Sequence, residues 1–160
     1  GITGLMNIVY NKGRSTVIIL DNSITGMTGH QQNPATGKDI RGDAAPAVNL
    51  EQLCRALGVS DVKTVDPFDM PALREALLAS LAFDGPSVII ARRPCALLSK
   101  ARTAPLRVAQ SCIGCRRCMG IACPALIFEA GRARVDISLC NGCGLCASVC
   151  PKGAIVKEEM

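Results

Sequence analysis

Aromatic residues are scarce in this sequence. Its 160 residues contain no Trp, one Tyr and three Phe, so 2% are aromatic, whereas 49% are hydrophobic. The core must therefore be built from aliphatic side chains and cysteine. Proteins that bind single-stranded nucleic acid stack its bases on aromatic rings, so this composition argues against nucleic acid as a partner.

Long hydrophobic runs are also lacking. A bilayer is crossed by about 20 consecutive apolar residues, and the longest aliphatic run near the start is residues 17–20. No basic segment followed by an apolar stretch and a cleavage site marks a secretion signal. We therefore expect a cytoplasmic protein with no membrane partner. The sequence begins with Gly rather than Met, from which we also expect that it starts inside a longer chain.

Negative charge is in slight deficit, since 18 Lys and Arg residues stand against 13 Asp and Glu residues and give a formal net charge of +5. That value counts each cysteine as a neutral thiol, although metal sites deprotonate their cysteines. A [4Fe–4S] core held by four thiolates carries a charge of about −2, so two such clusters would bring the chain to about +1. The charge thus gives no support for a nucleic-acid partner.

Cysteine, by contrast, is abundant, with ten residues. In a chain without a secretion signal, cysteines favour metal binding over disulfides. Eight of the ten form an internal repeat, in which CIGCRRC at residues 112–118 recurs as CNGCGLC at residues 140–146. The complete spacings are C-x2-C-x2-C-x4-C-P in the first copy and C-x2-C-x2-C-x3-C-P in the second.

The second spacing resembles the bacterial ferredoxin run, in which the fourth cysteine binds the cluster of the other copy. Carried onto this chain, the pattern implies two [4Fe–4S] clusters, the first held by Cys112, Cys115, Cys118 and Cys150 and the second by Cys140, Cys143, Cys146 and Cys123. Gly114, Gly142 and Gly144 permit close turns around the clusters. Zinc is the alternative for thiolate ligands, but zinc ribbons favour two well-separated CxxC pairs.

Three features of the cysteines leave alternatives open. The extra residue before Cys123 is either a bulge that leaves its cluster four-coordinate or the mark of a different cluster type. Cys54 falls on the apolar face of an expected helix, which favours a buried structural thiol. Cys95 follows Arg92, Arg93 and Pro94, a basic setting that activates thiols, so both a functional and a structural role are open for it.

Residues 1–94 alternate helical and strand-like patterns. Apolar residues at helical spacing predict a helix over 1–12, and β-branched aliphatic runs predict strands over 15–20, 62–65 and 87–91. Asn49 and Asp69 are suited to capping two further helices, of which the first ends at Gly58. The second helix is expected to bury its leucines, namely Leu73, Leu77, Leu78 and Leu81. This βαβ order predicts a parallel α/β sheet. We expect domains at 1–94 and 110–160, joined by a linker at 95–109.

The loop over residues 23–47 is longer than an ordinary connection and rich in glycine and small polar residues. It follows the carboxyl end of the first strand, where α/β sheets bind their ligands. Asn22 offers an amide oxygen suited to Mg²⁺, while Thr28 and nearby glycines offer donors to a phosphate. A solvent-exposed turn is the alternative.

Several of these runs resemble one known family. DNSITGMTGHQ at 21–31, together with GITGLMNIVYNKG at 1–13 and VIIARRPCAL at 88–97, is similar to the thiamine-diphosphate-binding domain of indolepyruvate ferredoxin oxidoreductase, alpha (large) subunit. CIGCRRCMGIACPAL at 112–126 and CNGCGLCASVCPKGAI at 140–155 are similar to the C-terminal ferredoxin domain of that subunit, including its longer gap. The resemblance implies a partial α/β parallel-sheet thiamine-diphosphate-binding domain, followed by a small α+β 2[4Fe–4S] ferredoxin-like domain.

The resemblance also implies roles for residues of the loop. Asn22 and the carbonyl of Ile24 match ligands of the Mg²⁺ that anchors thiamine diphosphate, and three further residues match positions next to that cofactor, namely Gly26, Thr28 and Gly29. His30 is the only histidine and a candidate for contact with substrate or diphosphate. The Gly-Asp pair that completes the family's metal site would precede Gly1, and the activating Glu belongs to another part of the enzyme.

The implied activity is oxidative decarboxylation of an aryl 2-oxo acid such as indolepyruvate to an aryl-acetyl-CoA, with single electrons passing through the clusters to ferredoxin. The implied partners are the smaller beta subunit and ferredoxin, with coenzyme A and the 2-oxo acid as substrates. Two other interpretations are a stand-alone ferredoxin-type electron carrier, in which residues 1–94 only dock a partner, and a zinc-stabilised interaction module.

Overall fold

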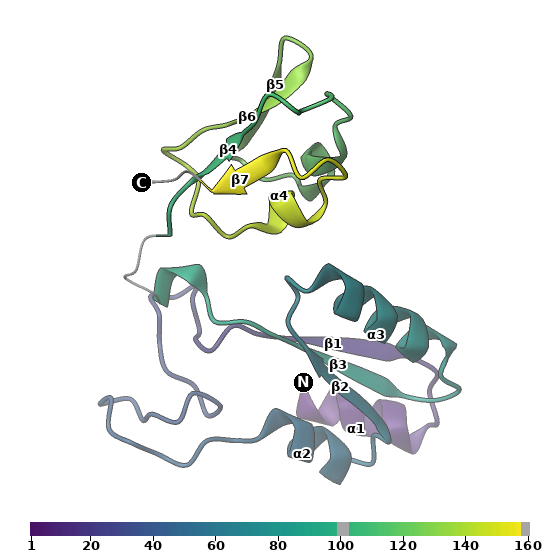
Figure 1. Cartoon of the computed structure of the whole chain (residues 1–160). Coiled ribbons are helices and arrows are strands. Elements are labelled where there is room, and N and C mark those ends of the chain that lie inside the picture. Colours follow the sequence, from purple (N-terminus) through teal and green to yellow (C-terminus); the bar gives the residue numbers. More distant parts are fainter. Residues whose placement is uncertain (99–102, 158–160) are drawn as a thin grey trace. The chain divides into compact units, whose positions relative to one another are not determined.

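The computed structural model describes residues 1–98 and 103–157 and divides the chain into two compact units (Figure 1). The first unit ends at Leu98. The second unit is described from Thr103 to Lys157. Each unit is described below by itself.

The first unit is a parallel three-stranded sheet with helices on both faces, as the βαβ pattern predicts. Its strand order is β1 (Thr16–Asp21), β3 (Ser87–Arg92), β2 (Asp61–Val65), and Ile18 pairs with Ile89 in the register of β1 and β3. Helix α1 (Ile2–Tyr10) precedes β1, and the connections between the strands contain α2 (Leu50–Ala56) and α3 (Met70–Ala82). Because β3 is central, its residues from Ser87 to Ala91 are all buried, which suits their continuous aliphatic run.

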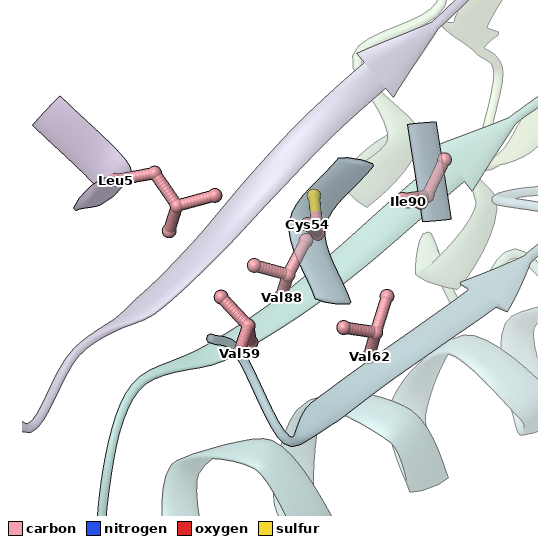
Figure 2. Close-up of a cluster of buried hydrophobic side chains, with 6 residues drawn as sticks. All are labelled: Leu5, Cys54, Val59, Val62, Val88 and Ile90. Carbon is pink, nitrogen blue, oxygen red and sulfur yellow. The ribbon is translucent and has the colours of Figure 1, made fainter. Parts of the chain in front are cut away.

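One sheet face forms the core with α1 and α2 (Figure 1). Figure 2 shows its buried members, namely Leu5, Cys54, Val59, Val62, Val88 and Ile90. Cys54 is only 2% exposed, and burial raises the pKa of its thiol. The expectation of a buried structural thiol at this position is confirmed.

The helix caps lie where the sequence predicts them. The Asn49 side chain accepts a hydrogen bond from the Gln52 N–H at 3.0 Å, and the Asp69 side chain accepts one from the Ala72 N–H at 3.1 Å. Each cap satisfies an N–H group that the first helical turn leaves without an intrahelical partner. Gly58, just beyond α2, has a φ of +96°, the left-handed conformation that glycine adopts without strain.

The buried face of α3 differs from the prediction. Ala76 and Ser80 are buried, whereas Leu78 is 54% and Leu81 63% exposed. The four leucines lie within an arc of about 140° on this helix. Leu73 and Leu77, at one edge of that arc, are half-buried, so the buried face is rotated away from Leu78 and Leu81. Small side chains at Ala76 and Ser80 allow α3 to approach β2 and β3 closely, and the polar partners of Ser80 then fix that face toward the sheet.

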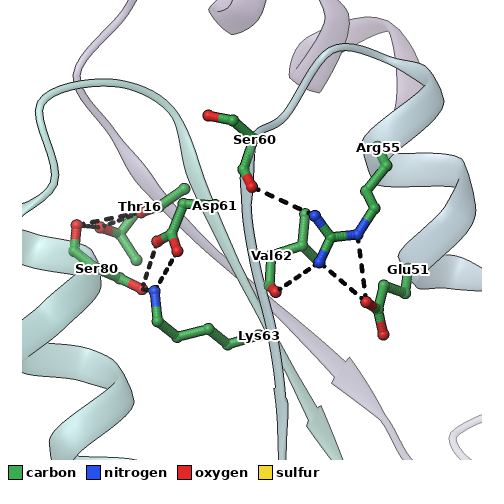
Figure 3. Close-up of polar contacts among 9 residues, drawn as sticks. Thr16, Glu51, Arg55, Ser60, Asp61, Val62, Lys63 and Ser80 are labelled. Carbon is green, nitrogen blue, oxygen red and sulfur yellow. Dashed lines mark hydrogen bonds and ion pairs between the residues drawn. The ribbon is translucent and has the colours of Figure 1, made fainter.

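Those partners form a polar network between α3 and the sheet (Figure 3). The Ser80 hydroxyl donates to Asp61 at 3.2 Å and accepts from Lys63 at 3.2 Å, while the Ser80 carbonyl accepts from Thr16 at 3.2 Å. Lys63 also forms an ion pair with Asp61. Among the described residues no buried side-chain nitrogen or oxygen lacks a hydrogen-bond partner, so this network satisfies its own groups and serves the fold.

The second unit consists of two short antiparallel sheets and two short helices. One sheet pairs β4 (Leu106–Val108) with β7 (Ile155–Lys157), and the other pairs β5 (Leu126–Glu129) with β6 (Arg132–Val135). The 3₁₀ helix η2 (Arg117–Ile121) and α4 (Leu145–Ser148) lie in the first and second copies of the repeat. Because β4 and β5 flank the first copy while β6 and β7 flank the second, each sheet takes one strand from each copy.

The segment expected to be a linker, residues 95–109, contains regular structure. The 3₁₀ turn η1 (Ala96–Leu98) closes the first unit, and β4 belongs to the second. A three-residue strand gives little local signal, because its stability comes from pairing with β7, which lies far along the chain. The domain boundaries at 94 and 110 stay a prediction.

Candidate cofactor sites

Four cysteines of the second unit line one pocket. They are Cys112, Cys115, Cys118 and Cys150, the set that the ferredoxin spacing assigns to the first cluster. The first three belong to the first copy of the repeat, and Cys150 follows α4 in the second copy. Burial first, and then the nearby thiolates of Cys112, Cys115 and Cys150, raises the pKa of the Cys118 thiol. Cys150 of the second copy therefore lies beside the three cysteines of the first copy, the arrangement that an exchange of the fourth ligand requires.

The second set of four is brought together around Cys146. Burial raises the pKa of the Cys146 thiol to about 11, and the nearby charges of Cys143, Cys140 and Cys123 also raise it. Cys123 comes from the first copy and the other three from the second. Both sets are thus completed by a residue from the opposite copy.

The chemistry of these donors fits iron–sulfur clusters. Four thiolates crowded together repel one another, and only a cationic metal core stabilises all of them at once. Ligands of a single tetrahedral zinc ion have sulfur atoms within about 4 Å of one another. Among the described residues, no group of three or more His, Cys, Asp or Glu side chains lies close enough to hold one metal ion. A cubane takes one thiolate on each of four irons, so its ligands stand further apart than those of zinc.

Backbone N–H groups point at the sulfur atoms in the same way in both copies. Gly142 and Leu106 donate to the Cys140 Sγ at 3.4 and 3.5 Å. In the first copy, hydrogen bonds from the backbone of Gly114 and then of Ala133 lower the pKa of the Cys112 thiol. The first cysteine of each copy thus accepts hydrogen bonds from the glycine two residues later and from a strand that flanks the opposite copy. That strand is β6 for Cys112 and β4 for Cys140. The sequence indicates the glycine donors, but the strand donors depend on the tertiary fold.

Gly114 and Gly142 are required by both conformation and space. Their φ angles are +67° and +68°. A Cβ atom at Gly114 would collide with the Gly131 carbonyl oxygen, and one at Gly142 would lie 2.5 Å from the Ala104 carbonyl oxygen. These glycines allow the backbone to pass close to its neighbours while their N–H groups face sulfur.

The extra residue of the first copy is accommodated at Ala122. This residue ends η2 in the left-handed conformation, with a φ of +54°, and its N–H donates to the Met119 carbonyl at 3.0 Å. The matching position before Cys150, Val149, has an ordinary φ of −97°. The longer gap is therefore a local backbone bulge, and Cys123 still lies beside the cysteines of the second set.

The predicted thiamine loop begins at the carboxyl end of β1 in the first unit. Asn22 is exposed, and its Oδ1 accepts the Ile24 N–H at 3.2 Å. The Cys95 N–H donates to the Asn22 carbonyl at 2.9 Å and so ties the loop to the segment after β3. Ile24 is buried and anchors the start of the loop. The amide oxygen of Asn22 keeps a second lone pair for a hard cation, so the donor set at this edge fits Mg²⁺.

The rest of the loop makes a small turn of its own. Thr25 and Gln31 exchange backbone hydrogen bonds at 2.9 and 3.0 Å, and the Gly29 N–H donates to the Gly26 carbonyl at 3.3 Å. Between them Thr28, Gly29 and His30 are exposed, and His30 has a φ of +61°. The five predicted cofactor-binding residues and His30 therefore share one loop, in which Ile24 is buried and Thr28, Gly29 and His30 are exposed.

Charged side chains line the same edge of the sheet. Arg92 forms an ion pair with Asp21 at 2.7 Å, and Arg93 forms one with Asp66 at 2.6 Å. The Arg93 guanidinium also stacks over the ring of Phe68 at 4.0 Å. Both arginines before Cys95 are thus engaged by carboxylates.

Comparisons with known proteins match each unit to a family model. Residues 2–91 match the family model described as "Thiamine pyrophosphate enzyme, C-terminal TPP binding domain", TPP being thiamine diphosphate. The chain belongs to the thiamine pyrophosphate enzyme family. Residues 133–156 match the "4Fe-4S binding domain" model. The predicted fold class is confirmed, and thiamine diphosphate and iron–sulfur cofactors are both supported.

Relatives match nearly the whole chain. Indolepyruvate oxidoreductase subunit IorA of Archaeoglobus fulgidus is 44% identical over 162 residues, which are 97% of this chain and 26% of that protein. IorA of Methanothermobacter marburgensis is 40% identical over 161 residues, 99% of this chain and 26% of that protein. Pyruvate synthase subunit PorD of Thermotoga maritima is 44% identical over 54 residues, 32% of this chain and 54% of that protein.

These matches confirm the resemblance to the indolepyruvate oxidoreductase family. The chain spans 26% of the length of the IorA relatives. Within the described residues, no helix has the length and apolar character that crossing a bilayer requires.

Proposed function

We propose that this chain is part of a cytoplasmic 2-oxo acid:ferredoxin oxidoreductase that converts aryl 2-oxo acids such as indolepyruvate to aryl-acetyl-CoA. Two [4Fe–4S] clusters on the chain carry the electrons to ferredoxin, and a smaller beta subunit completes the enzyme. Thiamine diphosphate, when bound with Mg²⁺, supplies the nucleophilic carbon for decarboxylation.

The observation that carries this proposal is the presence, on one chain, of a thiamine pyrophosphate enzyme domain and two interleaved sets of four cysteines. Oxidative decarboxylation releases two electrons, and a [4Fe–4S] cluster carries one electron at a time. Two clusters on the same chain therefore match the number of electrons that each turnover delivers.

The residues of the first unit have separate tasks in this proposal. Asn22 Oδ1 and the Ile24 carbonyl would hold Mg²⁺. Gly26 and Gly29 would let the diphosphate approach the backbone. The Thr28 hydroxyl donates to Gln31 Oε1 at 2.8 Å in this structure and would donate to the diphosphate instead. His30 lies at the exposed end of the loop, where it contacts the substrate or the diphosphate.

Paired cysteine variants test the cluster assignment. The chain, reconstituted anaerobically, is expected to bind about eight iron and eight sulfide. Cys150→Ala should remove the first cluster, and its matched control Cys123→Ala should remove the second, each leaving about four iron and a distinct spectrum. Iron bound without sulfide would favour a zinc-type site, and loss of the second cluster in Cys150→Ala would contradict the exchange of ligands.

Asn22→Leu, made in the complete oxidoreductase, tests the thiamine site. Thiamine diphosphate retention should fall while the iron–sulfur spectrum is unchanged. Asp39→Ala is the matched control, since Asp39 accepts the Arg41 and Asp43 N–H groups in the same loop but lies outside the proposed ligand set. Equal retention in both variants would refute the role of Asn22, and a complete enzyme that binds no thiamine diphosphate would favour a plain electron carrier.

A further inference from the structure

The two sets of cysteines differ in the charge that surrounds them. Arg116 and Lys152 line the pocket of the first set, and both are exposed cations. Arg132 precedes Ala133, a strand residue that lines the same pocket, and its exposed guanidinium donates to the Ala109 carbonyl at 2.8 Å. Three cations therefore lie around the first set.

The corresponding positions around the second set carry no charge. Gly144 occupies the place of Arg116 between the second and third cysteines of the repeat. Ala125 follows Cys123-Pro124 as Lys152 follows Cys150-Pro151. Pro105 precedes the strand donor Leu106, where Arg132 precedes Ala133. The two copies of the repeat can therefore be compared directly. At these three matching positions the side chains are cationic around the first set and uncharged around the second.

Arg116 is held at its pocket in spite of an unfavourable backbone. Its φ is +61°, while Gly144 has +82° at the matching position. The left-handed conformation costs about 1–2 kcal/mol for a residue with a side chain and nothing comparable for glycine. The Arg116 guanidinium stacks on Phe128, 4.2 Å from the ring centroid, and Phe128 also lines the pocket. The stacking holds this charge at the pocket that the first set of cysteines lines.

We propose that Arg116, Arg132 and Lys152 give the first cluster a higher reduction potential than the second, so that a single electron entering the module resides on the first cluster. This inference rests on the proposed two-cluster function. Reduction adds one negative charge to a cluster, so nearby cations stabilise the reduced state more than the oxidised state. Because all three cations are exposed, salt weakens the effect.

The test is a redox titration of the chain, reconstituted anaerobically and followed by electron paramagnetic resonance. Native protein should take up its two electrons in two resolved steps, and the steps should approach each other at high salt. Cys123→Ala keeps only the first set and should show the higher step. Arg116→Gly, which places the second copy's residue in the first, should lower the higher step alone and leave the iron content unchanged.

Two control variants separate charge from structure. Arg116→Lys keeps the charge and should retain most of the separation between the steps. Arg107→Gln removes an exposed cation of β4 that does not line the pocket of the first set and follows Leu106, a donor of the second set, so it should leave the higher step in place. Eight iron with one unresolved step, or an Arg116→Gly titration identical to native, would overturn this inference alone. An iron content of four would overturn the proposed two-cluster function and this inference with it.

Discussion

Adding one methyl group at Gly142, in Gly142→Ala, should prevent the second cluster from binding. In Gly142→Ala the new Cβ would lie 2.5 Å from the Ala104 carbonyl oxygen and 2.6 Å from the Thr103 hydroxyl, closer than real Cβ contacts. Because one of these atoms is backbone, the loop itself must move. Its movement would displace the Gly142 N–H, which donates to Cys140 Sγ, and the cysteines on either side.

Gly144→Ala is the matched control for this change. Gly144 also has a positive φ, +82° against +68° at Gly142, but a Cβ there meets no atom within 4 Å. Both variants carry the left-handed strain of about 1–2 kcal/mol. Only Gly142→Ala adds overpacking, typically a further 1–3 kcal/mol, so we expect a total of about 2–5 kcal/mol.

The assay is anaerobic reconstitution followed by iron analysis and loss of visible absorption in urea. Gly144→Ala should bind about eight iron with a modestly lower urea midpoint. Gly142→Ala should bind about four, because the second set of cysteines no longer closes. Equal iron content and equal midpoints in the two variants would show that the close approach of this loop to residues 103–104 does not support the second cluster.

Other parts of the chain give three further predictions. Ala122→Gly relieves left-handed strain and should raise the free energy of unfolding by about 0.5–1 kcal/mol in urea, with iron content unchanged. Burial raises the pKa of the Cys54 thiol above its unfolded-state value of about 8.5. The stability that the neutral buried thiol contributes is therefore complete below about pH 8.5 and is lost as the pH rises through the folded-state pKa. In urea titrations, the stability advantage of native protein over Cys54→Ala should shrink above the unfolded-state pKa. Leu81→Lys should change stability by less than about 0.5 kcal/mol, whereas Ala76→Leu should cost about 1–3 kcal/mol, and the reverse order would contradict the buried face of α3.

Local chemistry made much of the first unit predictable. The caps at Asn49 and Asp69 depend only on a side chain and the N–H groups of the next turn, and both lie as predicted. The strands were indicated by aliphatic runs, since a strand buried on both faces must be apolar throughout, as β3 is. The same expectation was wrong for β1, an edge strand in which Ile18 and Leu20 are exposed. The face of α3 was only partly right, because Leu73 and Leu77 are half-buried whereas Leu78 and Leu81 are exposed. The face toward the sheet is fixed by Ser80, whose partners on β1 and β2 are distant in the sequence.

The cysteine sets could be grouped from the sequence because the repeat carries the information in its spacing. What the spacing does not contain is the surroundings of each set. The N–H donors of Leu106 and Ala133 come from strands that pair across the repeat, so they follow from the tertiary fold. The left-handed backbone at Arg116 does have a sequence signal, since the other copy has glycine at that position. The pairing of Arg116 with Gly144 in the two copies is therefore enough to predict a left-handed conformation at Arg116.

The interleaving of the two copies has a consequence for folding. The core of the second unit contains Leu106, Cys118, Leu126, Ala133, Cys146 and Ile155, so two of its six buried members are proposed cluster ligands. A unit of this size buries too little apolar surface for a secure fold without metal or disulfide support. In the proposed assignment each cluster takes three ligands from one copy and one from the other, and each sheet takes a strand from both. Neither copy can therefore form its own site first, and binding of the two clusters must be coupled to the folding of the whole unit.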